Sequence, residues 1–404
     1  MKGILLFAGF FLCSLYALGQ YTPTDTTSYY SEYFKARRKI KISVPSEYAA
    51  NPNRRYKVIY LFDAQSTVLY DFVKSTLSFL KNYNNSYFDP VILVGVETRN
   101  RHFEFLPKHS NTQPKPGNYP AAGGADTLAL SLEKELIPFI NKNYRTTGFT
   151  IGIGHSLGGT FVTYTLLKFS SIFNAAIAVS PNYIYDNNQI ITISKEVNTL
   201  KNLEHKLLSV SFGKTDDLEE KFKPGTREFE NILKAARFSN FYYKIHELDN
   251  ESHGTTPMEG IFKGLIFINN YLSINYDTFK KIRDDKKISY ADNIKNYFQQ
   301  QRKNLGIQPS IGELNNLAYN AFYSNEKEEA IKTLEWAIAL YPDDANLFDS
   351  IAEITAGTGN IPKARQYYQQ GLAIIENQKT LLTKETYLSK TKWFHDKLAE
   401  IEKK

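Results

Sequence analysis

A serine between two glycines is the element of this sequence best suited to covalent chemistry. Residues 154–158 read G-H-S-L-G, which is the G-x-S-x-G pattern. The apolar residues 149–153 predict a strand that enters the pattern, and 159–169 predict a helix that leaves it. Such a turn holds the serine in a strained backbone conformation at a helix N-terminus, where backbone N–H groups can stabilise an oxyanion. Ser156 is therefore the predicted nucleophile.

A nucleophilic serine needs a general base, and His253 is placed to supply one. It lies in the polar stretch 250–257, after the last predicted strand and before a predicted helix. Four of the seven histidines follow the serine, and the other three lie before a strand, within a strand and in a helical region, at His205, His246 and His395. We expect His253 to be the base; an ordinary surface histidine is the alternative.

The base needs an acid to orient it, and the segment after the predicted strand 207–212 offers four carboxylates. They are Asp216, Asp217, Glu219 and Glu220. We expect Asp216 to be the acid because it comes earliest after the turn glycine, with Asp217 next and the others at the start of a solvated helix. The resulting order Ser, Asp, His is typical of α/β-hydrolases.

Strand and helix patterns alternate between residues 25 and 274, as α/β folds require. Predicted strands are 40–44, 57–62, 91–96, 150–154, 175–179, 207–212 and 242–247. Several are apolar on both faces, which indicates a mostly parallel sheet covered by helices. The predicted helices are 128–144, 157–169, 226–236 and 258–272. The fold class is therefore α/β, with the α/β-hydrolase arrangement.

The composition changes after this region. Residues 275–310 are rich in Lys, Asp and Gln and predict a solvated helical connector. Across 311–404 a self-similarity of 34 residues appears, as when Ala330 recurs as Ala364. That period is typical of tetratricopeptide repeats. Two repeats and a terminal helix over 383–403, with Trp393 and Leu398 as packing residues, complete a small helical domain.

The N-terminus predicts export. Lys2 is followed by an apolar run over 4–18 and by small residues at 17 and 19. This pattern is typical of a secretory signal peptide over 1–19, with an uncleaved anchor as the alternative. Removing it leaves no cysteine, because Cys13 is the only one, and so excludes disulfides, thiolate metal sites and a cysteine nucleophile. A periplasmic or secreted bacterial protein is the expectation.

Other function classes lack their sequence signatures. The formal net charge of +7 is modest for 404 residues and is not concentrated in a Lys/Arg cluster, so no nucleic-acid partner is expected. Neither HExxH, nor a P-loop, nor a dinucleotide-binding glycine motif after a first strand is present. No metal and no organic cofactor are implied.

Residues from about 25 to 272 resemble the putative esterase family, which includes esterase D-type, enterochelin (siderophore), feruloyl and acetylxylan esterases. The stretches that carry the likeness, besides the serine motif, are 58–64, 101–107, 123–126, 135–140, 144–146, 178–181 and 252–254. Exported members of this family sometimes continue into tetratricopeptide-like repeats. Departures from the family pattern at Ala64, Glu104 and Leu106 leave hydrolysis in place but put the substrate in doubt.

The resemblance implies further site residues. The N–H groups of Leu157 and of Ala64 or Gln65 would form the oxyanion hole. Arg101 would face the cleft and bind an anionic or catecholate group. A structural salt bridge from Arg101 to Glu104 or Asp126 is the alternative.

A serine esterase acting on an extracytoplasmic ester is the expected function. Siderophore lactones, feruloyl or acetyl esters of polysaccharides and simple thioesters all fit the same triad, so the sequence does not select the substrate. The alternative is a catalytically weak scaffold that binds a protein partner through its repeats, although simple packing of those repeats also accounts for their pattern. No stable membrane insertion is expected after signal cleavage, and the oligomeric state is left open.

Overall fold

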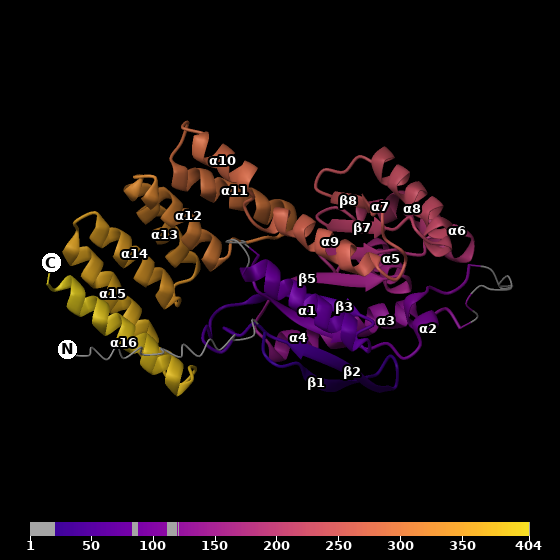
Figure 1. The fold of residues 1–404 in the computed structure, drawn as a ribbon, viewed down its shortest axis with the longest axis horizontal. Helices are drawn as coiled ribbons and strands as arrows, with labels where there is room; N and C mark the ends of the chain where they lie inside the picture. Colours follow the sequence, from indigo (N-terminus) through magenta and orange to yellow (C-terminus); the bar gives the residue numbers. More distant parts are fainter. Residues whose placement is uncertain (1–20, 83–87, 111–118, 120, 404) are drawn as a thin grey trace, which may run out of the picture.

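In a computed structural model, which describes residues 21–82, 88–110, 119 and 121–403, one twisted sheet of eight strands organises the N-terminal two thirds of the chain (Figure 1). Its strand order is β1-β2-β4-β3-β5-β6-β7-β8. β1 and β2 pair antiparallel with their neighbours and all later pairs are parallel. The strands span Asp25–Ser31, Ala36–Ser43, Tyr56–Phe62, Val91–Val96, Thr146–His155, Ala175–Val179, Leu207–Phe212 and Tyr242–Glu247.

Helices cover both faces of the sheet because the central strands are apolar on both sides. β3, β4, β6 and β7 are buried along their whole length. Helices α1 (Thr67–Asn82) and α9 (Thr256–Leu272) share one core with one face, and Figure 1 shows them in front of the sheet. The other face packs against α2 to α8, which span Arg101–Phe105, Ala125–Ser131, Ile137–Asn143, Leu157–Lys168, Tyr185–Ser194, Val197–Lys201 and Asp217–Ala235. A π-helical turn, Leu132–Leu136, joins α3 to α4.

Several elements differ from the sequence expectation, among them helices α1, α6 and α7, which lie outside the predicted helices. β1 was not predicted, because its sequence DTTSYYS is mostly polar and it forms an edge of the sheet with an exposed side. Helix α8 begins at Asp217, well before the predicted start at 226. Pro224 and Gly225 have low helix propensity, which argues against a helix over these residues. In the structure, however, Phe222 is buried, and Gly225 packs so closely that a Cβ there would lie 2.8 Å from Cγ2 of Ile184. Tertiary packing therefore overrides the local preference.

The C-terminal region is entirely helical. Helices α10 to α16 span Tyr276–Asp284, Tyr290–Leu305, Ile311–Tyr323, Lys327–Leu340, Ala345–Gly357, Ile361–Asn377 and Lys384–Ile401. The antiparallel pairs α12/α13 and α14/α15 begin at residues offset by the expected period, and Ala330 and Ala364 are both fully buried. The assignment to tetratricopeptide repeats and the exact domain boundaries stay predictions.

Two details of this region depart from expectation. The connector is not simply solvated, since Tyr290, Ile294 and Phe298 are buried against the following helices. Leu305 belongs to the core that α1 and α9 form with one face of the sheet. In α16 the buried aromatic residue is Phe394, whereas its neighbour Trp393 is half exposed.

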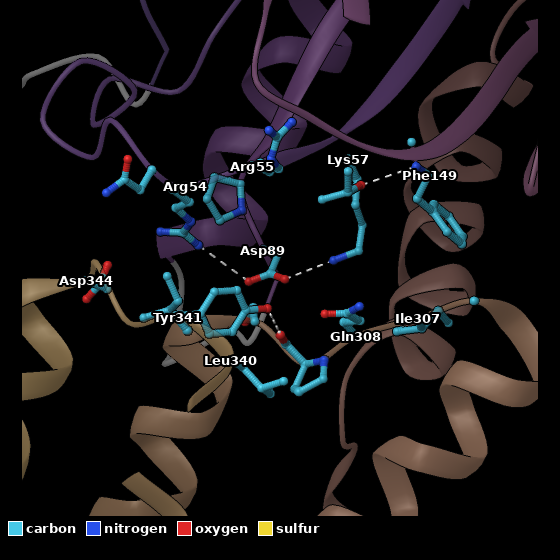
Figure 2. Close-up of a pocket in the computed structure, with 18 of the residues that line it drawn as sticks. Arg54, Arg55, Lys57, Asp89, Phe149, Ile307, Gln308, Leu340, Tyr341 and Asp344 are labelled. Atoms are coloured by element: carbon cyan, nitrogen blue, oxygen red, sulfur yellow. Dashed lines mark hydrogen bonds and ion pairs between the residues drawn. The ribbon is translucent and has the colours of Figure 1, made fainter. Parts of the chain in front are cut away.

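The helical region meets the sheet at the amino ends of the parallel strands. A cavity of about 550 Å³ lies at this junction, lined from both sides (Figure 2). At its centre the carboxylate of Asp89 lies 3.0 Å from Nζ of Lys57 and 3.6 Å from the guanidinium of Arg54. The helical region and this cavity thus lie at the amino ends of the parallel strands, opposite the carboxyl ends, where β5 leads into the serine motif.

None of the described helices is both long and apolar enough to cross a membrane. The predicted signal peptide, 1–19, lies outside the described residues.

Candidate active site

Ser156 occupies a sharp turn between β5, which ends at His155, and α5, which begins at Leu157. Its backbone has φ 59° and ψ −120°, a region that residues other than glycine rarely adopt. Gly154 is sterically required, because a Cβ there would lie 2.2 Å from the backbone of Gly158, whereas a Cβ at Gly158 would meet no atom closer than 3.6 Å. The structure therefore has the strand–turn–helix that the sequence predicts, and it presents the serine at the carboxyl edge of the sheet, where ligands of open α/β sheets bind.

His253 comes to the same edge in the loop between β8 and α9. Its imidazole packs on that of His155, with ring centroids 4.7 Å apart. Its Nδ1 lies 2.6 Å from Oε1 of Glu219, whose side chain is completely buried. The second oxygen of Glu219 accepts a hydrogen bond of 2.6 Å from the N–H of Gly213. A buried carboxylate therefore contacts Nδ1, the ring nitrogen that the acid contacts in a Ser-His-Asp triad.

The ionised form of Glu219 is the stabilised one. Burial by itself raises the pKa of this carboxyl group, but hydrogen bonds from His253, Ser180 and the Gly213 N–H outweigh it and hold the pKa below its ordinary value. A carboxylate that stays charged can accept a hydrogen bond from Nδ1–H and stabilise an imidazolium.

Asp216, the expected acid, does not contact the imidazole ring. Its Oδ1 caps α8 by accepting from the N–H of Glu219 at 2.8 Å, and its Oδ2 accepts from the backbone N–H of His253 at 2.7 Å. Both oxygens are thus occupied by backbone donors. The pattern D-x-x-E, with an N-cap followed three residues later by an acid, is the signal that separates the two roles. Of the other carboxylates in this segment, Asp217 and Glu220 are exposed on the helix surface.

The two alternatives for the second oxyanion donor are also distinguished. The N–H of Ala64 donates to the carbonyl of Val96 at 3.2 Å, so it is engaged. Within the described part of the chain, neither the N–H of Gln65 nor that of Leu157 has an acceptor. The side chain of Gln65 fixes its own backbone by bonding Asp63 and the N–H of Thr98. Gln65, rather than Ala64, has the free donor that an oxyanion hole needs.

Arg101 forms a salt bridge, but with neither of the expected partners. Its Nε lies 2.9 Å and 3.0 Å from the two carboxylate oxygens of Asp63, which follows β3. Glu104 instead pairs with Arg38 in the core, and Asp126 accepts from the hydroxyl of Tyr164. The Arg101 side chain keeps 39% exposure, and its Nη2 lies 3.5 Å from the carbonyl oxygen of His155. Its guanidinium is therefore both anchored and accessible beside the serine turn.

No group of three or more His, Cys, Asp or Glu side chains that could hold a metal ion occurs among the described residues.

The sequence matches a known protein family and characterised relatives. The sequence profile of a family described as Putative esterase matches residues 31–255, more than half of the chain. A siderophore enterobactin esterase of Emericella nidulans is 26% identical over 191 residues, which are 41% of this chain and 61% of that protein. The ferri-bacillibactin esterase BesA of Bacillus subtilis is 31% identical over 159 residues, which are 35% of this chain and 53% of that protein. The chain thus spans between half and two thirds of the length of these relatives.

Solved structures show the same fold. An IroE-like serine hydrolase from Shewanella oneidensis superposes with a TM-score of 0.64 at 20% identity, covering 79% of this chain and all of that one. An uncharacterised protein from Capnocytophaga ochracea superposes with a TM-score of 0.61 at 15% identity, covering 95% of this chain and all of that one. These likenesses confirm the predicted α/β-hydrolase class and extend, in the second case, over most of the helical region.

Proposed function

Because this chain belongs to the putative esterase family, we propose that it hydrolyses carboxylic esters through a Ser156–His253–Glu219 triad. The observation that supports this most is the pairing of a strained serine turn with a buried carboxylate bonded to the histidine of a neighbouring loop. A scaffold without catalytic activity has no use for the strain at Ser156 or for a buried charge at Glu219. The scaffold alternative is therefore not favoured.

The proposed reaction is a two-step acyl transfer. His253 Nε2 takes the proton of the Ser156 hydroxyl as its oxygen attacks the ester carbonyl carbon. The N–H groups of Leu157 and Gln65 hold the resulting oxyanion, while Glu219 stabilises the imidazolium. The tetrahedral intermediate then collapses, and the alcohol leaves with the proton from His253. Water, activated by the same histidine, releases the acid from the acyl-enzyme.

We further propose an extracytoplasmic ester as the substrate: a siderophore lactone, or a feruloyl or acetyl ester of a polysaccharide. The names of the two relatives described above, both siderophore esterases, support the first class. Arg101 supports it as well, because an exposed guanidinium beside the nucleophile can bind an anionic or catecholate group. The predicted signal peptide supports a periplasmic or secreted location, where such esters are encountered.

The test is hydrolysis of p-nitrophenyl acetate and butyrate by the wild-type protein beside Ser156→Ala. We expect turnover by the wild type and its loss in the variant, with both samples folded by circular dichroism. A catecholate lactone, a feruloyl ester and an acetylated xylan, assayed next, would identify the substrate class. A folded wild type that hydrolyses none of these esters contradicts the proposal, and so does activity that survives in Ser156→Ala.

A further inference from the structure

The backbone of His253 is held on both sides. Its N–H donates to Asp216 Oδ2 at 2.7 Å. Its carbonyl oxygen lies 2.8 Å from Nε2 of His155 and 3.0 Å from the hydroxyl oxygen of Thr256. These bonds involve the two peptide groups that flank residue 253. The orientation of those two peptide groups sets the direction in which the Cβ of His253 projects. The same hydrogen bonds therefore help to fix the position of the imidazole.

The bond from His155 requires a specific protonation state. A carbonyl oxygen only accepts, so Nε2 of His155 must carry a hydrogen. Burial, together with repulsion from His253 and Arg101, lowers the pKa of His155 to about 4. The ring is therefore neutral near pH 7 and carries its single N–H on Nε2. It contributes a donor without placing a second positive charge beside an imidazolium at His253.

This contact joins the two segments that carry the reacting groups. His155 immediately precedes Ser156 at the end of β5, whereas His253 belongs to a loop almost a hundred residues later. The hydrogen bond and the packing of the two rings therefore set the histidine loop directly on the strand end from which the serine projects. Misplacing a catalytic group by about 1 Å can lower the rate on the order of 100-fold, so we expect the loss of this contact to lower turnover.

We propose that His155 is a positioning residue, whose Nε2–H holds the His253 loop in register with Ser156. It neither takes nor gives the transferred proton in the proposed reaction, and it acts through its contacts with the backbone and the ring of His253. This inference rests on the proposed function of Ser156 and His253 and adds a role that the family assignment does not carry.

The test compares two variants of similar size. In His155→Gln the amide Nε2 can reach about as far as the imidazole Nε2 and still donate, whereas His155→Leu fills the space without a donor. For p-nitrophenyl acetate we expect His155→Leu to lower kcat by about 10- to 100-fold with KM little changed. We expect kcat of His155→Gln to exceed that of His155→Leu by about tenfold, which is the worth of one hydrogen bond. If His155→Leu does not fold, His155→Asn takes its place, because its amide is too short to reach.

A second readout does not depend on activity. Hydrogen–deuterium exchange over residues 250–256 should quicken in His155→Leu and return toward the wild-type rate in His155→Gln. Equal kcat in the two variants, or unchanged exchange in His155→Leu, overturns the positioning role while leaving the esterase proposal intact. A wild type that is inactive on every ester instead overturns the proposed function, even where the exchange rates respond as expected.

Discussion

At the scale of single residues, two neighbouring acids contact the same histidine in different ways. Glu219 is buried against the ring Nδ1, and Asp216 binds backbone N–H groups. The difference follows from helix geometry. Asp216 precedes α8 and caps it, whereas Glu219 lies in the first turn, where its longer side chain extends toward the loop of His253.

Replacing Glu219 should therefore impair catalysis far more than replacing an equally acidic neighbour. Glu219→Gln removes the charge that orients and stabilises the imidazolium, and we expect kcat/KM for p-nitrophenyl acetate to fall by about 10³- to 10⁴-fold. Glu220→Gln is the matched control, because Glu220 is exposed one position further along the same helix. Comparable losses in both variants would contradict the assignment of Glu219 as the triad acid.

The same carboxylate makes stability depend on pH. The pKa of Glu219 is lower in the folded protein than its ordinary value of 4.5, so the anion favours the folded state. That contribution is complete above about pH 4.5 and is lost as the pH falls through the lowered folded-state pKa. The free energies of unfolding of the wild type and of Glu219→Gln, measured in urea, should therefore depend differently on pH as the pH falls below about 4.5. Parallel curves for the two proteins would argue against a charged Glu219.

At the scale of elements, the serine turn tolerates no side chain at Gly154. A Cβ there would lie 2.2 Å from the backbone carbon and oxygen of Gly158, and backbone atoms of a packed helix start cannot move aside. We expect Gly154→Ala to destabilise the protein by about 3 kcal/mol or more, measured by urea unfolding. The control is Gly312→Ala in α12, where the added Cβ meets no atom within 4 Å and helix propensity should improve. A stable Gly154→Ala would show that the turn can adjust.

At the scale of the whole molecule, the helical region packs at the amino ends of the parallel strands, whereas Ser156 and His253 lie at the carboxyl ends. Asp89 lies at this junction and pairs with Lys57 and Arg54, which belong to the sheet region as it does. Burial is the largest single effect on the pKa of Asp89 and raises it, but the two cations and a hydrogen bond from Ser310, at the start of α12, hold this pKa below its ordinary value. Asp89→Asn should lower the melting temperature by a few degrees, because it leaves two partly buried cations without their anion. The junction lies at the amino ends of the parallel strands, and Ser156 lies at their carboxyl ends. We therefore expect kcat to change by less than about twofold, which is less than the loss of one hydrogen bond in the active site would cause. A large loss of kcat would show that the helical region influences the catalytic edge.

The sequence alone determined what depends on short stretches of chain. Ser156 follows from a strand, a G-x-S-x-G turn and a helix that are contiguous, and the parallel sheet follows from strands that are apolar on both faces. His253 could be selected because only one histidine after the serine lies in a loop that follows a strand and precedes a helix. These features need no knowledge of contacts between distant segments.

Only the tertiary structure decided among groups that compete for the same partners. Glu219 rather than Asp216 contacts the imidazole because the shorter side chain of Asp216 accepts the N-cap hydrogen bond of α8. Gln65 rather than Ala64 keeps a free N–H because β4 accepts the other one. Arg101 pairs with Asp63 instead of with Glu104 or Asp126. Each choice depends on distances between segments far apart in the chain. The D-x-x-E spacing indicates which acid caps α8, but no spacing shows which acid reaches the imidazole, which backbone N–H stays free or which carboxylate pairs with Arg101.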